Sequence, residues 1–260
     1  MGDLYGIIPV SYSLWLRRKV LDCIEQIFKK HIAYKAIRLL DAGCGNGEFS
    51  LVFSRMPKVC SIVGVDFAKE MLSVAQKRAS LNGYADRFEA VEANLEDLSV
   101  IADCSFELIW FFGVIEHLAQ PRKVIEQLKK KLKPGGTFIL KVPRRWSIAY
   151  WVYLMFGQSP KNWGKPKRLL EWFDFQNRLK YYRWYSVSEV VELCQASGLI
   201  ILEQVPVNYS QVNVGPISYL FRLLGRIGAI GFRVLDLIDL CFKLFYRIPS
   251  TEFLVLTKDG

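Results

Sequence analysis

The sequence lacks the residue patterns of a metal-binding or disulfide-stabilised protein. Its 260 residues contain only two histidines, His31 and His117, and six cysteines, no two of which form a CxxC pair. A structural zinc site needs several such ligands at close, regular spacing, so we expect no metal site. The cysteines are expected to be the reduced thiols of a cytoplasmic protein.

Leader and membrane-spanning patterns are missing as well. Asp3 comes early, and the basic cluster at 17–19 follows apolar residues instead of preceding them, which is not the order of a signal peptide. No run of about 20 uncharged apolar residues occurs, so no transmembrane helix is expected. The sequence therefore predicts a cytoplasmic protein whose contact with a membrane, if any, is peripheral.

What the sequence has in excess is positive charge. It carries 35 Lys and Arg against 25 Asp and Glu, a net charge of +10, while 52% of its residues are hydrophobic. This surplus suits an anionic partner such as nucleic acid, an acidic membrane surface or a phosphorylated substrate. A net charge also keeps proteins in solution, so composition alone does not choose between these interpretations.

The stretch 39–48 organises the chain. An apolar run ends at Asp41, and three glycines follow at alternate positions before a helical pattern begins at Phe49. Glycine permits positive φ and lets a ligand approach bare backbone, and the following helix offers free N–H groups. The three glycines of this predicted ligand-binding turn are Gly43, Gly45 and Gly47.

Short apolar strands alternate with amphipathic helices through residues 37–142. Strands are predicted at 37–40, 61–65, 88–93, 106–112 and 137–142, and helices at 68–81 and 121–132. This alternation predicts a parallel sheet with helices on both faces, in which ligands bind at the carboxyl ends of the strands. The residues at those ends are Asp41, Asp66, Asn94 and Gly113.

The remaining segments frame this sheet within one predicted domain, 1–260. Residues 12–33 form a predicted amphipathic helix of an N-terminal cover, 1–35. Ser186 and Glu189 have the capping-box pattern that starts a helix, and the last strands are expected at 199–205 and 252–257. Two insertions interrupt the pattern: an aromatic and basic segment at 144–185 and an apolar helical segment at 206–249.

The second insertion contains the pattern of an amphipathic helix. On a helix of about 100° per residue, segment 217–248 gathers its charges within an arc of roughly 140°. The charged residues are Arg222, Arg226, Arg233, Asp236, Asp239, Lys243 and Arg247. A narrow, mostly basic stripe on a broad apolar helix is typical of helices in a membrane interface. The alternative is a helix pair packed over the substrate entrance.

Five short pieces together resemble the class I S-adenosylmethionine-dependent methyltransferases. They are Leu-Leu-Asp-Ala-Gly-Cys-Gly-Asn-Gly at 39–47, Val-Gly-Val-Asp at 63–66, Ser-Phe-Glu-Leu-Ile at 105–109, Val-Ile-Glu-His-Leu at 114–118 and Leu-Lys-Pro-Gly-Gly at 132–136. Within that superfamily the chain is similar to methyltransferase type 11 and the ubiquinone-biosynthesis O-methyltransferase-like group. The rival is a nicotinamide dehydrogenase, whose GxGxxG fingerprint differs from the GxGxG found here.

The resemblance implies a Rossmann-like, seven-stranded, mostly parallel α/β sheet whose last strand is antiparallel, and S-adenosylmethionine as the methyl donor. It implies that Asp41 and the backbone of the glycine turn hold the methionine part of the cofactor, and that Asp66 binds the ribose hydroxyls. The other implied cofactor contacts are Cys44 in the turn, Phe67 beside the adenine, Asn94 and Leu95 at the adenine edge, and Phe112 and Gly113 at the methionine end.

Two neighbouring residues are candidates for a catalytic base. An oxygen acceptor must lose its proton on methylation, and His117 is the only histidine beside the predicted cofactor edge. Glu116 is the second candidate, and the alternative for both is a structural role at a helix start. Some relatives hold a divalent metal through a glutamate three residues before the Glu-His pair. Gly113 occupies that position here, which argues against metal dependence.

The predicted reaction is methyl transfer to a small-molecule or lipid-like acceptor, most favourably at oxygen. The basic and aromatic segment 144–183 suits nucleic acid, an anionic lipid or a phosphorylated substrate, or it is a lid with solvated charges. Nucleic acid is the less favoured partner, because the motif Phe111–Val114 lacks the Pro-Pro-aromatic and Pro-Cys patterns of nucleic-acid methyltransferases. The alternatives are an RNA or protein methyltransferase and a cofactor-binding but inactive accessory protein.

Overall fold

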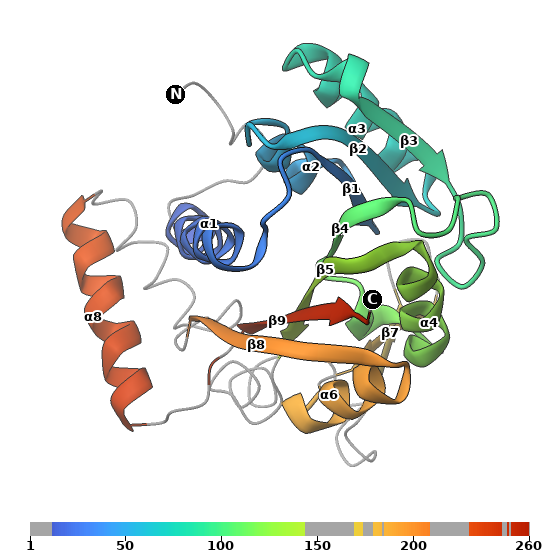
Figure 1. The fold of residues 1–260 in the computed structure, drawn as a ribbon. Helices are drawn as coiled ribbons and strands as arrows, with labels where there is room; N and C mark the ends of the chain where they lie inside the picture. The colour runs from blue at the N-terminus through green and yellow to red at the C-terminus, as the bar shows by residue number, and fades with distance from the viewer. Residues whose placement is uncertain are drawn as a thin grey trace.

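Seven strands form the central sheet of the protein (Figure 1). The computed structural model describes residues 12–143, 169–173, 179–183, 185–208, 229–245, 249 and 251–259. In spatial order the strands are β3 (Phe88–Glu92), β2 (Val59–Asp66), β1 (Ile37–Ala42), β4 (Phe106–Phe111), β5 (Leu132–Pro143), β9 (Thr251–Lys258) and β8 (Leu199–Asn208). Neighbours from β3 to β5 are parallel, and β9 is antiparallel to both β5 and β8. The predicted mostly parallel sheet with an antiparallel last strand is confirmed.

The centre of the sheet is covered by side chains on both faces. β1 and β4 lie at the centre, and their residues are apolar on both faces, as parallel strands covered by helices on both sides require. Leu39 and Leu108 contribute to one core, whereas Leu40 and Ile109 contribute to the other, because successive side chains of a strand point to opposite faces.

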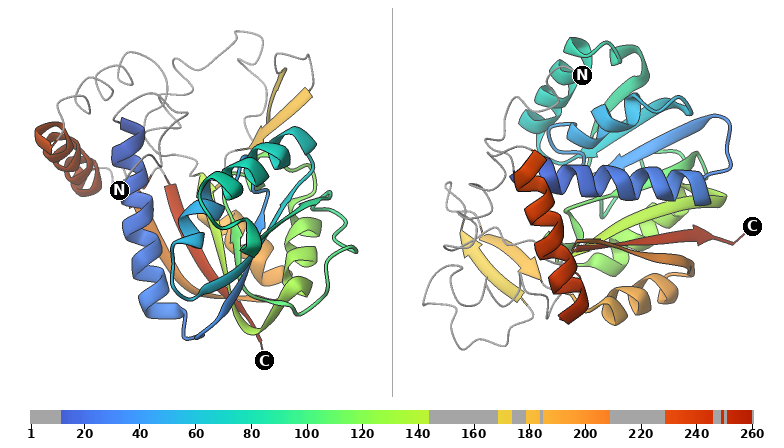
Figure 2. Two further views of the ribbon diagram at one scale, coloured as in Figure 1. Left: turned by 90° about the horizontal axis from the view of Figure 1, so that it is seen from above. Right: turned by 90° about the vertical axis from the view of Figure 1, so that its left-hand side faces the viewer.

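Helices pack against both faces of the sheet (Figure 2). The helices of the described residues are α1 (Tyr12–His31), α2 (Glu48–Ser54), α3 (Lys69–Leu81), α4 (Pro121–Lys131), α6 (Val187–Ala196) and α8 (Ala229–Phe245). α1 and α2 share one core, to which α1 contributes the fully buried Ile24 and Ile27. α4 and α6 cover the other face, where Leu128 and Val190 are fully buried. Each such side chain contributes roughly 1.5–3 kcal/mol through burial.

The observed elements are close to the predicted ones, with two extensions. β5 begins at Leu132, five residues before the predicted start, because its pairing with β4 shifts register between Phe106 and Leu108 and so accommodates Gly135 at φ +70°. β8 continues from the predicted end at 205 to Asn208. The predicted capping box is present: Ser186 Oγ accepts from Glu189 N, and the Glu189 carboxylate accepts from Ser186 N.

The two insertions are described in part. In the first, β6 (Leu169–Phe173) and β7 (Leu179–Arg183) pair as a separate antiparallel sheet, which the aromatic and basic composition did not predict. In the second, α8 spans Ala229–Phe245, inside the predicted helix 217–248. Arg222, Arg226 and Arg247 of the predicted charged stripe lie outside the described residues.

Candidate cofactor and acceptor site

The glycine turn lies between β1 and α2 and is bonded to the end of β2. The amides of Gly43 and Cys44 both donate to the Val65 carbonyl oxygen, at 2.7 and 2.9 Å, and Gly47 N donates to Cys44 O at 2.9 Å. All three glycines have positive φ, between +51° and +75°. Since L side chains rarely adopt this conformation, the alternate spacing of the glycines is a requirement of the backbone.

The three glycines serve different purposes. A Cβ at Gly43 would overlap the side chain of Val114, and one at Gly47 would lie 2.9 Å from the Cβ of Ala75, so both allow close packing. A Cβ at Gly45 meets nothing within 4 Å. Gly45 therefore exposes its backbone to open space, where a ligand can approach it directly.

Asp41 lies beneath the glycine turn, near the end of β1. Its carboxylate is 3% exposed and accepts a hydrogen bond of 2.6 Å from Ser50 Oγ, on α2. Burial, with a smaller contribution from the nearby Asp66 charge, raises the pKa of Asp41 to about 7 against the lowering effect of the Ser50 bond. A cationic group bound beside it would favour the ionised form, so the site is suited to an ammonium group.

Asp66 stands at the end of β2, beside the turn. Its Oδ2 accepts from Gly45 N at 2.9 Å, and its Oδ1 accepts from Ala68 N at 2.9 Å. Each carboxylate oxygen keeps further acceptor capacity. The side chain thus fixes the open part of the turn and still presents oxygens that hydroxyl groups can bind.

The residues predicted at the adenine edge adjoin Asp66. Ala93 N donates to Asp66 O at 3.1 Å, which brings the end of β3 beside the end of β2. Phe67 is 77% exposed, whereas Leu95 is buried. Asn94 is exposed, but its side-chain oxygen already accepts from Glu96 N at 3.0 Å. A ligand amine would have to share that oxygen.

The Cys44 side chain is turned into the fold. Its thiol is buried against Gly64 and donates weakly to Gly45 O at 3.7 Å, and burial raises its pKa well above the usual range. A contact between Cys44 and a ligand would therefore come from its backbone.

The end of β4 meets the turn from the other side. Phe112 lies within an aromatic cluster, with its ring centroid 4.4 Å from Phe49 and 5.5 Å from Trp110. Gly113 has φ +72°, and a Cβ there meets nothing within 4 Å. The next residue, Val114, rests on Gly43. The structure thus brings the predicted methionine-end residues next to the turn, and Val114 joins them as a residue that the sequence did not indicate.

The two base candidates have opposite environments. Both belong to the short 3-10 helix η2 (Ile115–His117). Glu116 is 3% exposed and forms an ion pair of 2.8 Å with Lys141 Nζ, while its Oε2 is buried without a hydrogen-bond partner among the described residues. His117 is exposed, and its backbone N donates to Val114 O at 2.9 Å. Of the two side chains, only that of His117 faces solvent.

Lys141 is the polar residue of this region that sequence reasoning missed. It lies on β5, its ammonium is 5.5 Å from the Phe112 ring centroid, and its side chain is 14% exposed. The signal was available, because Lys141 is the one charged residue in the mostly apolar predicted strand, 137–142. A buried charge of this kind needs a partner, and Glu116 is that partner.

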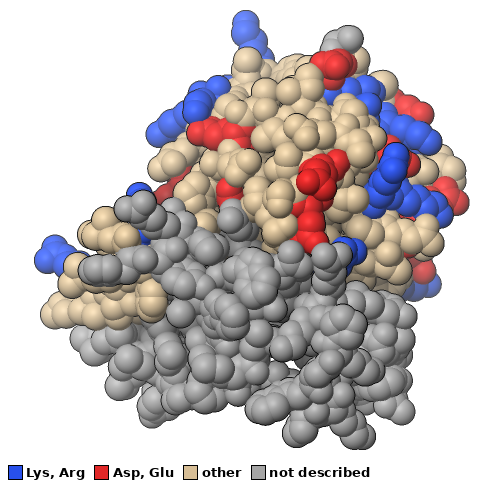
Figure 3. All heavy atoms as spheres, turned by 90° about the horizontal axis from the view of Figure 1, so that it is seen from below, with Lys and Arg blue, Asp and Glu red and all other residues tan. Residues whose placement is uncertain are grey.

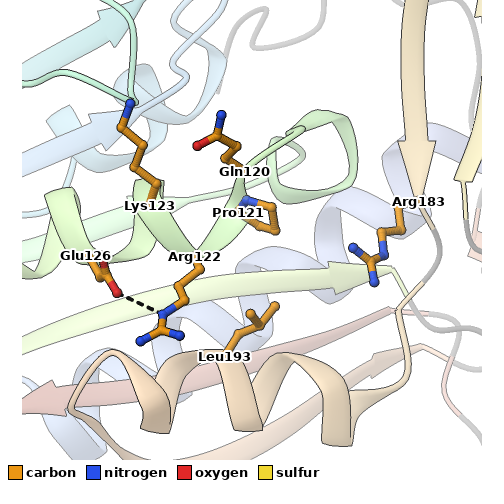
Figure 4. Close-up of a pocket in the computed structure, with 7 residues that line it drawn as sticks. All are labelled: Gln120, Pro121, Arg122, Lys123, Glu126, Arg183 and Leu193. Atoms are coloured by element: carbon orange, nitrogen blue, oxygen red, sulfur yellow. Dashed lines mark hydrogen bonds and ion pairs between the residues drawn. The ribbon is translucent and has the colours of Figure 1, made fainter.

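A pocket of about 550 Å³ opens between α4 and α6, apart from the glycine turn (Figure 4). The residues that line it are Gln120, Pro121, Arg122, Lys123, Glu126, Arg183 and Leu193. It shares no residue with the predicted cofactor site. Arg122 is already paired with Glu126 at 2.9 Å, so the pocket is less basic than its composition indicates.

Within the described residues, no three His, Cys, Asp or Glu side chains come together in a way that could hold a metal ion. The helices of the same part of the chain are all too short or too polar to span a bilayer.

Comparison with known proteins adds a family match to this geometry. The family model described as "Methyltransferase domain" matches residues 33–182. The mitochondrial ubiquinone biosynthesis O-methyltransferase of Schizosaccharomyces pombe is 29% identical over 130 residues, which are 50% of this chain and 46% of that protein. The ubiquinone biosynthesis O-methyltransferase of Roseobacter denitrificans is 26% identical over 193 residues, 74% of this chain and 70% of that protein.

The fold also has solved counterparts. The PH0226 protein from Pyrococcus horikoshii superposes with a TM-score of 0.62 at 16% identity, over 100% of both chains. At that identity the likeness concerns the fold alone.

Proposed function

Because this chain belongs to the methyltransferase domain family, we propose that it methylates an oxygen atom of a small, apolar or lipid-like acceptor. The chain is a class I S-adenosylmethionine-dependent methyltransferase, with the seven-stranded sheet that the resemblance implied. The relatives named for ubiquinone biosynthesis motivate the choice of an oxygen acceptor, and their low identity leaves the acceptor itself a proposal.

The observation that carries the proposal is the joint placement of Asp41, Gly45 and Asp66. One buried carboxylate, one open stretch of positive-φ backbone and one carboxylate with spare acceptor capacity meet at the ends of β1 and β2. These groups fit the ammonium, carboxylate and ribose hydroxyls of S-adenosylmethionine. When bound, the cofactor supplies an electrophilic methyl group. The fixed backbone of the turn then serves to orient the donor, which is the main catalytic contribution expected in a direct displacement.

We assign the remaining cofactor contacts to the neighbouring strand ends. Phe67 and Asn94 would contact the adenine from its exposed side, and Leu95 would contact it from the buried side. Phe112 and Gly113 would close the methionine end, since Gly113 leaves open space there. Cys44 would contribute through its backbone.

The acceptor is assigned to the carboxyl ends of β4, β5 and β8. Two groups there are buried without hydrogen-bond partners among the described residues, Glu116 Oε2 and both side-chain atoms of Asn208. Buried polar groups are normally satisfied, so a hydroxyl or carbonyl group of an acceptor is a suitable partner. The Asn208→Leu variant is expected to raise KM for the acceptor more than it lowers kcat.

For proton removal we propose His117 as the base and Glu116 as a positioning residue held by Lys141. The exposed imidazole is accessible to an acceptor hydroxyl, and a base of this type typically contributes 10²–10⁴-fold to the rate. The His117→Ala variant is expected to lose at least about tenfold in kcat. Near-normal turnover would show that His117 has a structural role only.

The acceptor class can be tested with a radiolabelled methyl donor. Purified protein and a cell extract are incubated with the labelled cofactor, and the products are partitioned between an organic and an aqueous phase. Label in the organic phase is expected, and the Gly45→Ala variant serves as the control. Label in RNA or protein would replace the acceptor proposed here, and donor binding without any product would indicate an inactive accessory protein. An apolar acceptor resides in membranes, so the proposal includes peripheral contact with an anionic membrane surface.

A further inference from the structure

We infer that α8 binds an anionic bilayer through its outer face, with its apolar side chains in the lipid and its acidic side against the protein. The inference deepens the proposed membrane contact, and it does not depend on the identity of the acceptor. It rests on how α8 is oriented against α1.

The acidic side of α8 faces inward. Asp236 Oδ2 lies 2.7 Å from Arg18 Nη2, its Oδ1 lies 3.0 Å from Lys19 Nζ, and Asp239 is 3.9 Å from the same lysine. Asp239 is 7% exposed. Both acids of α8 thus pair with cations of α1, Asp239 from a buried position and Asp236 at the edge of the contact, where its side chain is 38% exposed.

The apolar side of α8 faces outward. Its large side chains are between 37% and 68% exposed, although the protein offers a core in which such residues are usually buried. They are Ile230, Val234, Leu237, Leu240 and Leu244. Their spacing places them on one side of the helix, opposite the buried Leu235 and Asp239. Here the usual arrangement of an amphipathic surface helix is reversed.

The fold places this side at the edge of the molecule. α8 lies on the side of α1 away from the sheet in Figure 1, and it crosses in front of one end of α1 in the right-hand view of Figure 2. Seen from below, both signs of charge are spread over the rest of the described surface. At the left edge, where α8 lies, the surface consists mostly of uncharged residues (tan), with Lys or Arg (blue) beside them (Figure 3).

The charges left outside favour an anionic lipid surface over a second copy of the chain. α8 has four charged residues: two acids that pair with α1, and two exposed cations, Arg233 and Lys243. A second copy would bring the same cations together, whereas anionic headgroups complement them. Exposed cations on a helix that also exposes a large apolar side are expected of an interfacial helix, because long basic side chains can reach the headgroups.

The first test is vesicle sedimentation without methyl donor or acceptor. Wild-type protein is expected to bind phosphatidylcholine vesicles containing one-third phosphatidylglycerol, and to bind pure phosphatidylcholine weakly. The double variant Leu237→Asp/Leu244→Asp should lose at least about tenfold in affinity, and Arg233→Gln about fivefold on anionic vesicles only. The matched control is Leu81→Asp, since Leu81 is 76% exposed at the end of α3 and should leave binding unchanged.

A second measurement locates the contact. Cys241 is exposed on α8, and Cys60 and Cys104 are the other exposed cysteines. An environment-sensitive dye on Cys241, with Cys60 and Cys104 changed to serine, should shift to the blue when anionic vesicles are added. The same dye on Cys104, with Cys60 and Cys241 changed to serine, should not.

Three outcomes would overturn the inference. They are equal vesicle binding by the wild type and the Leu237→Asp/Leu244→Asp variant, no binding by either, and a wild-type dimer in light scattering that the same variant converts to a monomer. The last result would assign the surface to a second copy of the chain. Because no methyl transfer is measured, loss of vesicle binding is distinguishable from failure of the proposed activity, which is assayed separately by transfer of label from the methyl donor.

Discussion

The side chain of Val114 occupies the space that a side chain at Gly43 would need, so the loop after β4 rests directly on the first glycine of the turn. The two residues are distant in the sequence, and each belongs to a piece that resembles the methyltransferases. Their contact joins the donor end of the site to the segment that carries Glu116 and His117.

This contact predicts that a smaller residue at 114 will partly restore the stability lost on changing Gly43. The Gly43→Ala variant should lose about 2–4 kcal/mol of unfolding free energy, because it combines a strained positive φ with an overlap against Val114. Adding Val114→Ala should restore the part that comes from the overlap, about 1 kcal/mol or more. Urea unfolding of the single and double variants measures both values. Strictly additive losses would show that the two residues are not coupled.

A substitution at Gly45 should affect cofactor binding beyond its effect on the stability of the fold. Gly45 and Gly83 both have positive φ, and a Cβ at either meets nothing within 4 Å. Alanine at each position should therefore cost a similar amount, about 1–2 kcal/mol. Only Gly45→Ala should weaken binding of S-adenosylmethionine, by at least about tenfold in calorimetry. Equal affinities in the two variants would remove Gly45 from the cofactor site.

Asp41 predicts a pH effect of definite sign. Its pKa in the folded protein is about 7, raised from an ordinary 3.8, so the folded state holds a proton that the unfolded state has released between these values. This contribution to stability is complete below pH 4 and is lost as the pH rises through 7, by up to about 4 kcal/mol. The Asp41→Asn variant should lack the decline when unfolding is measured from pH 4 to 8.

Cofactor binding should follow the opposite trend at the same residue. In the proposed site the ionised carboxylate would bind the donor's ammonium group, so the affinity of the wild type is expected to rise from pH 6 to pH 8. Asp41→Asn should bind about 10–100-fold more weakly at pH 8 and show no such rise. A pH-independent wild-type affinity would contradict the proposed contact.

Because Glu116 and Lys141 are paired, the losses of unfolding free energy on changing each residue should not be additive. Removal of one partner leaves the other charge buried, so Lys141→Met or Glu116→Gln alone should cost about 3–5 kcal/mol. The double variant should recover a large part of that loss. The positioning role adds a second readout, since Lys141→Met should lower kcat while cofactor affinity stays within about threefold. Unchanged kcat would reduce the pair to a structural role.

Much of the catalytic half of the fold could be predicted from the sequence, because its signals are local. Apolar runs locate the strands, and alternate glycines mark the turn. Asp41 and Asp66 stand where buried strands end, and the structure places both beside the turn. The sequence also restricts the spatial order of the strands, since parallel strands joined by helices allow few arrangements.

What could not be predicted depends on contacts between distant residues. Lys141 and Glu116 pair across 25 positions, and Arg18 reaches Asp236 across 218. Helical periodicity separates the two faces of α8, but it does not say which face is inside. In the structure the inner face carries Asp236 and Asp239, which pair with Arg18 and Lys19 on α1. The pairing of β6 with β7 likewise has no clear signal in a segment that is rich in aromatic and basic residues.

The second insertion leaves the sheet and returns to it at neighbouring positions. The second insertion leaves β8 at Asn208 and re-enters β9 at Thr251, and these two residues are register partners. The sheet itself holds the two ends together, so the length of the excursion adds little to the entropy of closing it. New segments can therefore be exchanged at this point while the donor half, 37–143, keeps its geometry. The part of the chain between these two residues can thus change in evolution without disturbing the methyl-transfer framework.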